Sequence, residues 1–333
     1  MLYSPQPMHI PDGFLSIVIS ILCWAVTVVL VGAAVSRTNK SLGERQVPLM
    51  GVMAAFIFAA QMLNFPVAGG TSGHLLGGTL AAITLGPWAG MLVMTAVIAV
   101  QGLLFQDGGL LVMGANILNM GLLTVAVGYG LYRSASGTSQ RAKLTIAGIA
   151  AWLSVMTGAL ATSIELWLSG TSHLQTVVIA MLGVHALIGL GEALITVAAL
   201  GFILRTRPDI LGEDSASTQG SRGWVVVGIV IALAVVLLSP LASADPDGLN
   251  RVAMDLGFIQ SAQSGSGPLA GYTLPFLANA SAAKIAAGVI GALAVLAVAF
   301  LTGRSLLKKN SSLPPENHPS NMPSKHDVIN RQS

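Results

Sequence analysis

The amino-acid sequence predicts an all-α integral membrane protein with about nine transmembrane helices. The first observation is composition: 53% of the 333 residues are hydrophobic and only 9% are charged, whereas soluble domains carry about 25% charged residues. The second is length, because several apolar runs reach the roughly 20 residues that a helix needs to cross a bilayer. The third is the placement of basic residues between these runs, which orients membrane proteins. We therefore expect a multi-pass protein of the cell (inner) membrane.

The predicted spans follow one another along most of the chain. They cover roughly residues 14–36, 47–64, 73–86, 87–105, 109–132, 144–168, 173–204, 224–242 and 283–303. The third span is short for a straight crossing, and a glycine-rich stretch, residues 64–74, leads into it. Irregular backbone at membrane depth is tolerated only where protein buries it or where it lines a polar cavity. This stretch is therefore a candidate site.

Lysine and arginine residues gather in alternate connections between the spans. The basic segments are residues 37–46, 133–143, 205–223 and the tail after 303. By contrast, residues 1–13 contain no lysine or arginine, and the loop 243–282 contains Arg251 alone. Since basic loops remain cytoplasmic, nine spans with an outside N-terminus place all four basic segments inside. The net charge of +3 is then explained by membrane orientation, and we expect no nucleic-acid binding.

Composition also divides the chain into parts. We predict a leader of uncertain status (1–7), a seven-span domain (8–205), a polar cytoplasmic linker (206–223), a two-span accessory domain (224–303) and a disordered cytoplasmic tail (304–333). Leu249, Val252 and Leu256 follow helical spacing in the outer loop of the accessory domain, which predicts a short amphipathic helix there. The single cysteine, Cys23, excludes an internal disulfide and thiolate metal clusters.

The segment from Met8 to Gly13, MHIPDG, has the residues of an N-terminal metal chelate. If Met8 begins the mature chain, its amine, the deprotonated amide nitrogen of His9 and the His9 imidazole Nδ1 can surround one metal in a plane. A fourth nitrogen then completes a square, which suits nickel(II) or copper(II). His74 could supply it, because span parity places His74 on the same outer surface as His9. The ordinary alternatives are a solvated His9 and a His74 that makes structural hydrogen bonds.

Other polar side chains fall within the predicted spans. His185 and Glu192 are seven residues apart and share a helix face, and ionisable groups inside spans are functional candidates. The same interpretation applies to Glu165, Asn116 and Asn119, and its alternative is a hydrogen bond between helices that fixes packing. Asp12 could accept a hydrogen bond from a ligand or form a turn. The 13 methionines show no paired pattern, which favours core filling over a copper relay.

Two other functional classes leave traces in the sequence. The run Gly70-Thr71-Ser72-Gly73 matches the G-x-S-G of rhomboid intramembrane proteases, with Ser72 as nucleophile and His185 as the candidate base. A metal permease that works alone is the third possibility. The chain has neither a G-x-x-x-x-G-K-[ST] phosphate loop nor an H-E-x-x-H motif, so we expect neither ATP hydrolysis of the usual kind nor zincin-type proteolysis.

Three segments, residues 8–16, 51–78 and 183–196, resemble the CbiM/NikM family, the substrate-capture membrane subunits of energy-coupling-factor transporters for cobalt and nickel. With the span count, the resemblance covers residues 8–205. Residues 224–303 resemble the small PDGLE-type (NikN/CbiN-like) partner subunit, here fused to the capture domain. The usual pattern has Glu after Asp-Gly-Leu, and this chain has Asn250, so we expect that no carboxylate is needed at that position.

The resemblance implies a transport subunit, not an enzyme. It implies that the cargo is Ni²⁺ or Co²⁺, that there is no prosthetic group, and that a coupling transmembrane subunit and cytoplasmic ABC ATPases supply the energy. It also implies that Met8, His9 and His74 hold the metal; Asp12, Ser72, His185 and Glu192 are candidate supporting residues. Seven residues precede Met8 as written, so this site requires a start at Met8 or removal of the leader. Because the ligands must be deprotonated, metal affinity should fall below about pH 6.5.

Overall fold

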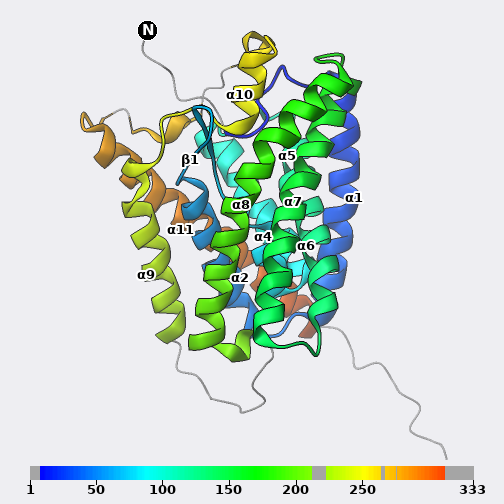
Figure 1. The fold of residues 1–333 in the computed structure, drawn as a ribbon. Helices are drawn as coiled ribbons and strands as arrows, with labels where there is room; N and C mark the ends of the chain where they lie inside the picture. Colours follow the sequence, from blue (N-terminus) through cyan, green and yellow to red (C-terminus); the bar gives the residue numbers. More distant parts are fainter. Residues whose placement is uncertain (1–7, 212–222, 264–266, 275, 312–333) are drawn as a thin grey trace, which may run out of the picture.

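The computed structural model of the protein describes residues 8–211, 223–263, 267–274 and 276–311. Figure 1 shows a bundle of long helices with a small hairpin and a short helix at one end. The helices are α1 (Ile17–Ser41), α2 (Gln46–Gln61), α3 (Gly78–Leu85), α4 (Pro87–Val100), α5 (Met113–Asn116), α6 (Thr124–Tyr132), α7 (Gln140–Leu168), α8 (Leu174–Thr206), α9 (Gly223–Leu237), α10 (Gly248–Asp255) and α11 (Ala280–Ser311). Strands β1 (Phe65–Val67) and β2 (Thr71–Gly73) pair antiparallel.

The helices are apolar on the outside of the bundle as well as in its core. On α1, for example, Ile17, Val18 and Ile21 are exposed, which suits a lipid surface and not water. Within the described residues, seven helical runs are long and apolar enough to cross a membrane. The prediction of an all-α, multi-pass integral membrane protein is therefore confirmed.

The two remaining predicted spans are shorter in the structure. The span 47–64 corresponds to α2, which has 16 residues, and the span 73–86 corresponds to α3, which has only eight. Helix α3 begins at Gly78 because the preceding residues Leu76 and Gly77 donate their backbone N–H groups to the Glu192 carboxylate. The short span predicted over 73–86 is thus helical only over Gly78–Leu85, and the total of nine crossings remains a prediction.

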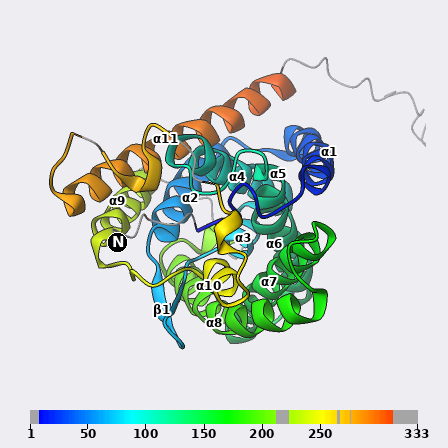
Figure 2. The ribbon, with the colours of Figure 1, turned by 90° about the horizontal axis from the view of Figure 1, so that it is seen from above.

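Helices α9 and α11 of the accessory domain pack against α2, on one flank of the bundle (Figure 2). The contact is close, since a side chain at Gly291 would overlap the ring of Phe58. Helix α11 continues to Ser311, so the helix extends beyond residue 303, where the disordered tail was expected to begin. The rest of that tail, the leader 1–7 and residues 212–222 of the linker lie outside the described residues.

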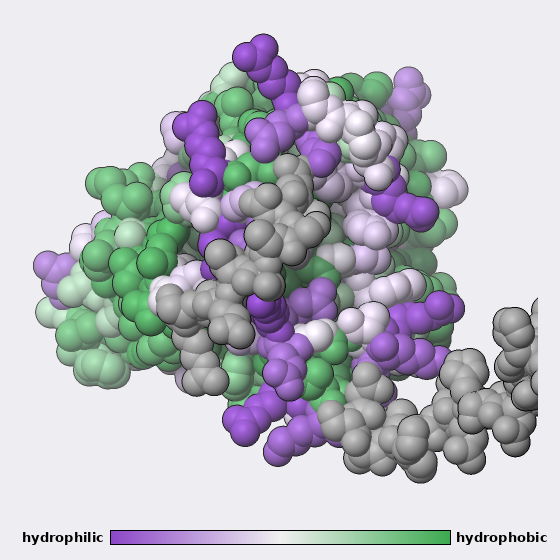
Figure 3. Space-filling view, turned by 90° about the horizontal axis from the view of Figure 1, so that it is seen from below, coloured by the Kyte–Doolittle hydropathy of each residue, from purple (hydrophilic) through white to green (hydrophobic). Residues whose placement is uncertain are grey.

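The two ends of the bundle differ in chemistry. The ends of α1, α6 and α8, from which the predicted basic connections start, lie together with the end of α11 at one end of the bundle (Figure 1). Figure 3 shows hydrophilic side chains spread across that end. The hairpin, α10 and the segment that precedes α1 lie at the opposite end. Helix α10 confirms the predicted short helix, with Leu249 and Val252 buried. The side chains that the sequence singled out for metal binding therefore share one end of the bundle.

Candidate metal centre

The segment before α1 is held in place by Asp12. The backbone N–H groups of Leu110, Leu111 and Val112 donate to its carboxylate over 3.1, 3.0 and 3.1 Å. These three residues lead into α5, where backbone donors lack partners within the helix. Asp12 thus anchors the N-terminal segment to the connection between α4 and α5, and it makes no contact with either candidate histidine in this arrangement.

Asn116 on α5 fixes the residue next to His9. The Ile10 N–H donates to Asn116 Oδ1 over 3.0 Å, and Asn116 Nδ2 donates to the Ile10 carbonyl over 3.0 Å. This reciprocal pair satisfies both backbone groups of Ile10, as a neighbouring strand would do. Gly108 packs against this pair with φ +106°, where an added Cβ would lie 3.0 Å from the Cβ of His9. His9 is consequently held on both sides.

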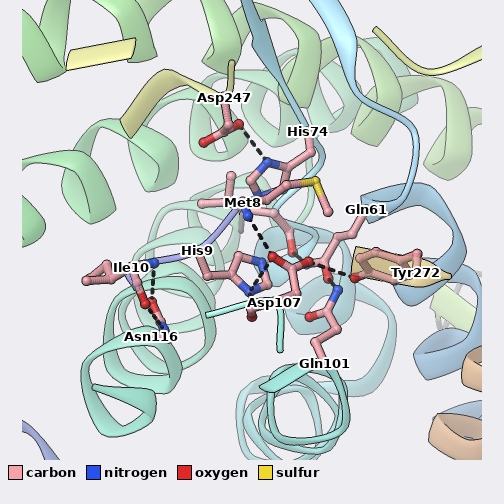
Figure 4. A network of polar contacts seen from close by, with 11 residues as sticks. Met8, His9, Ile10, Gln61, His74, Gln101, Asp107, Asn116, Asp247 and Tyr272 are labelled. Atoms are coloured by element: carbon pink, nitrogen blue, oxygen red, sulfur yellow. Dashed lines mark hydrogen bonds and ion pairs between the residues drawn. The ribbon is translucent and has the colours of Figure 1, made fainter. Parts of the chain in front are cut away.

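Figure 4 shows His9 and His74 side by side. The segment before α1 and the hairpin region, which carry them, lie at the end of the bundle opposite the basic connections (Figure 1). Their ring centroids are 5.5 Å apart, and the two residues are 2% and 6% exposed. The Nδ1 of His9 lies 2.9 Å from the Asp107 carbonyl, and the Nδ1 of His74 lies 3.0 Å from Asp247 Oδ1. Among the described residues, neither Nε2 atom has a hydrogen-bond partner. A buried nitrogen without a hydrogen-bond partner lowers the stability of the fold by about 1–3 kcal/mol. A metal ion bound to that nitrogen would offset this loss.

The backbone nitrogen of Met8 lies beside the same rings. It donates to Asp107 Oδ1 over 2.6 Å, and the Tyr272 hydroxyl donates to the other oxygen of that carboxylate over 2.7 Å. The sequence did not predict a role for Asp107 or Tyr272. A signal for Asp107 existed, because it is the only acidic residue between Glu44 and Glu165. Tyr272 had no such signal, since it lies in the outer loop of the accessory domain.

A small cavity joins these groups. It measures about 60 Å³ and is lined by Met8, His9, His74 and Asp247, with His185 and Asn119 further along its wall. A cavity needs only about 10–15 Å³ of such space to hold one water molecule, so this cavity has room for a metal ion. The structure thus brings the three predicted ligand residues to one cavity.

Glu192 supports the glycine loop and does not contact the rings. Its two carboxylate oxygens accept from Leu76 N at 2.6 Å and Gly77 N at 2.8 Å. From the other side, Gln61 Nε2 donates to the Leu76 carbonyl over 2.8 Å. The backbone that follows His74 is therefore clamped between α2 and α8. His185, two turns earlier on the same face of α8, reaches the cavity but directs its Nδ1 to the Met181 carbonyl at 2.8 Å.

Ser72 and His185 are not paired as a protease would require. The Ser72 hydroxyl donates to the Asp245 carbonyl over 2.8 Å, whereas His185 Nδ1 faces Met181. A nucleophilic serine needs an adjacent base. Ser72 instead ties the glycine loop to the accessory domain.

Glu165 belongs to a separate buried cluster. Asn119 Nδ2 donates to Glu165 Oε2 over 2.7 Å and to Thr162 Oγ1 over 3.2 Å, and the Cys23 thiol donates to Glu165 Oε1 over 3.4 Å. These bonds join α1, the π-helical segment Ile117–Leu123 and α7. The packing interpretation of Glu165 and Asn119 accounts for these contacts, and Asn119 also reaches the cavity wall.

Comparison with known proteins places the chain in a family. Residues 9–210 match the family model described as CbiM, cobalt uptake substrate-specific transmembrane region, and residues 222–308 match the PDGLE domain. A putative fused nickel transport protein NikMN of Archaeoglobus fulgidus is 36% identical over 89% of this chain and 98% of its own length. A probable fused nickel transport protein LarMN of Lactiplantibacillus plantarum is 34% identical over 70% of this chain and 74% of its own.

A solved structure is also similar. The crystal structure of a transition metal transporter is 34% identical, with a TM-score of 0.55, and the match covers 64% of this chain and all of that one. The relatives are thus nickel and cobalt transport proteins, and the fused arrangement recurs among them. The chain belongs to the CbiM family of substrate-specific transmembrane regions for cobalt uptake, and it carries its PDGLE-type partner in the same polypeptide.

Proposed function

We propose that this chain is the substrate-capture subunit of an ATP-driven importer for Ni²⁺ or Co²⁺ and that it binds the metal at its extracytoplasmic face. The observation that carries the proposal is the meeting of two buried imidazoles, each with an unpartnered Nε2, beside the Met8 nitrogen in one small cavity. That cavity lies at the end opposite the basic connections, which supports an outer position through the positive-inside rule.

The donors available favour a site built partly from backbone nitrogen. Within the residues that the structure describes, no three His, Cys, Asp or Glu side chains come together as a metal cage. Two imidazoles alone give too few ligands, whereas a Met8 amine and the His9 amide nitrogen bring the number to four. Four nitrogens in a plane suit nickel(II). The neighbouring carboxylates of Asp107 and Asp247 offset the charge of the dication in a buried position.

Chelation through His9 Nδ1 requires one contact to break. In this arrangement Nδ1 lies against the Asp107 carbonyl at 2.9 Å, so the ring must turn toward the Met8 nitrogen. Asp12 and the Asn116–Ile10 pair hold the backbone on the C-terminal side of His9. The movement can thus be confined to the side chain and to Met8.

We assign metal binding to this chain and the supply of energy to separate proteins. The capture domain (8–205) holds the metal, the linker (206–223) connects it to the accessory domain (224–303), and a coupling membrane subunit with cytoplasmic ATPases drives the conformational cycle. The chain has no phosphate loop of its own, which supports separate ATPases.

Reconstitution tests this assignment. Proteoliposomes that contain this chain, the coupling subunit and the ATPases are expected to accumulate ⁶³Ni²⁺ only when ATP is present on the ATPase side. Liposomes with this chain alone should show no accumulation, because no energy source reaches the metal. Uptake against a gradient by the chain alone would contradict the proposal and indicate a permease that works by itself.

Nickel affinity is expected to fall as the pH is lowered. Burial lowers the pKa of His9 and outweighs the opposing Asp107 carboxylate. Burial also acts to lower the pKa of His74, but the charge and hydrogen bond of Asp247 outweigh it and hold this pKa above the ordinary histidine value. As the pH falls through this raised pKa, a proton competes with the metal for His74.

The Kd for Ni²⁺ is measured by calorimetry while the pH is lowered from 8 to 5. It should start to increase while the pH is still above about 6.5, the ordinary histidine pKa. The thermal unfolding temperature at each pH serves as the control for folding. A Kd that stays constant down to about pH 5 is incompatible with histidine ligation.

A further inference from the structure

We propose that Asp247 of the accessory domain is a positioning residue that fixes the proton of His74 on Nδ1 and thereby presents Nε2 to the metal. The inference rests on the proposed function, in which His74 is a ligand. It assigns to the accessory domain a structural part of the metal centre itself.

The contact between Asp247 and His74 is direct and buried. Asp247 Oδ1 lies 3.0 Å from His74 Nδ1, and the two residues are 5% and 6% exposed. A carboxylate can only accept at this distance, so Nδ1 must carry the hydrogen. The neutral ring then has its lone pair on Nε2, which faces the cavity without a partner among the described residues. Carboxylates that bond the second nitrogen of a ligating histidine set its tautomer and orientation in metal sites.

The backbone just before Asp247 is hydrogen-bonded to the glycine loop. The Ser72 N–H donates to the Pro246 carbonyl over 2.9 Å, and the Ser72 hydroxyl donates to the Asp245 carbonyl over 2.8 Å. Ser72 is two residues before His74, so these bonds hold the two loops together beside the contact between His74 and Asp247, which Figure 4 shows. Gly248 makes the approach possible, since a Cβ there would collide with Ile188 on α8.

The backbone of Asp247 is fixed by the helix that follows it. The accessory domain supplies an acid to the centre at Asp247, three residues before the position where the usual pattern has Glu. Asp247 directly precedes α10. The first hydrogen bond of this helix runs from the Arg251 N–H to the Asp247 carbonyl over 2.8 Å. The helix therefore fixes the backbone from which the carboxylate projects.

The test is a pair of substitutions with a matched control. Asp247→Ala and Asp247→Leu both remove the acceptor, and the leucine approximates the original volume if the alanine variant fails to fold. Asp245→Asn is the control, because that side chain is exposed and only its backbone carbonyl contacts Ser72. All variants are made in nanodiscs, in a protein that begins at Met8 and keeps both domains.

The first measurement is ¹⁵N NMR of the histidine side chains without added metal, with the His74 signals assigned by their loss in His74→Ala. The wild type and Asp245→Asn should show His74 protonated on Nδ1. Both Asp247 variants should populate the Nε2-protonated tautomer. The second measurement is calorimetry with Ni²⁺, in which the Asp247 variants should bind about 10–100-fold more weakly, as is typical when an outer partner of a ligand is removed.

Asp247 variants that keep the Nδ1-protonated tautomer and the affinity of Asp245→Asn would overturn the inference. A different result marks failure of the proposed function: His74→Ala would then bind nickel as tightly as the wild type. The tautomer measurement remains valid in that case, because it uses protein without added metal.

Discussion

Replacing His74 with alanine is expected to weaken Ni²⁺ binding by more than about 100-fold. Removal of an outer partner of a metal ligand already costs about 10–100-fold, and His74→Ala removes a ligand itself. The ring that remains, His9, cannot complete a four-nitrogen set. Calorimetric titration of the purified chain with Ni²⁺ at pH 7.5 measures the effect.

His173→Ala is the matched control for that experiment. His173 is an exposed histidine that precedes α8 and whose side chain makes no capping bond, so its loss removes an imidazole without touching the cavity. Ser72→Ala should likewise leave His74 in place as a ligand and retain most of the affinity. If His74→Ala and His173→Ala bind nickel equally well, the metal site lies elsewhere in the chain.

The second large effect concerns the beginning of the chain. A protein that starts at Met8 is expected to bind Ni²⁺ in a square-planar arrangement, visible as a d–d absorption band, whereas a protein that retains residues 1–7 should lose this band and most of its affinity. In the longer chain the Met8 nitrogen is a peptide nitrogen and not an amine. It then carries one hydrogen, which it donates to Asp107, and has no lone pair available for the metal.

Mass spectrometry and N-terminal sequencing establish which form is present. A version that lacks seven residues at the C-terminus, 327–333, controls for the change in chain length, because these residues lie far along the sequence from the site. A mature protein that keeps Met1 and still shows the full affinity and the square-planar band would exclude the Met8 amine as a ligand.

Several features of the site could be predicted from sequence because they depend on local pattern. The membrane class follows from long apolar runs. His9 stands out because, in a chain that begins at Met8, it would be the second residue, and a histidine there has distinctive chelate chemistry. His74 stands out because it ends a glycine-rich stretch predicted to lie at or near membrane depth, where irregular backbone is tolerated only if protein buries it or it lines a polar cavity. Glu192 and His185 were identified as ionisable residues on one helix face, although their roles could not be separated by spacing.

The supporting residues could not be predicted in the same way. Asp107 bonds the Met8 nitrogen across 99 residues of sequence, and Asp247 bonds His74 across 173. Neither spacing has a local pattern, since the partners meet only when the connection between α4 and α5 and the accessory loop fold over the bundle. Tyr272, a further partner of Asp107, reaches it across 165 residues.

By itself, the sequence determined that this protein is a helical membrane protein with histidines suited to nickel or cobalt, because apolar length and ligand type are properties of short segments. Only the tertiary structure decided where the third predicted helix begins. Glu192, 116 residues from Leu76, takes up the backbone N–H groups of Leu76 and Gly77, and the loop stays irregular as a result. The same tertiary contacts decided which nitrogen of each histidine remains unpartnered, because that depends on carboxyl and carbonyl oxygens brought from distant parts of the chain.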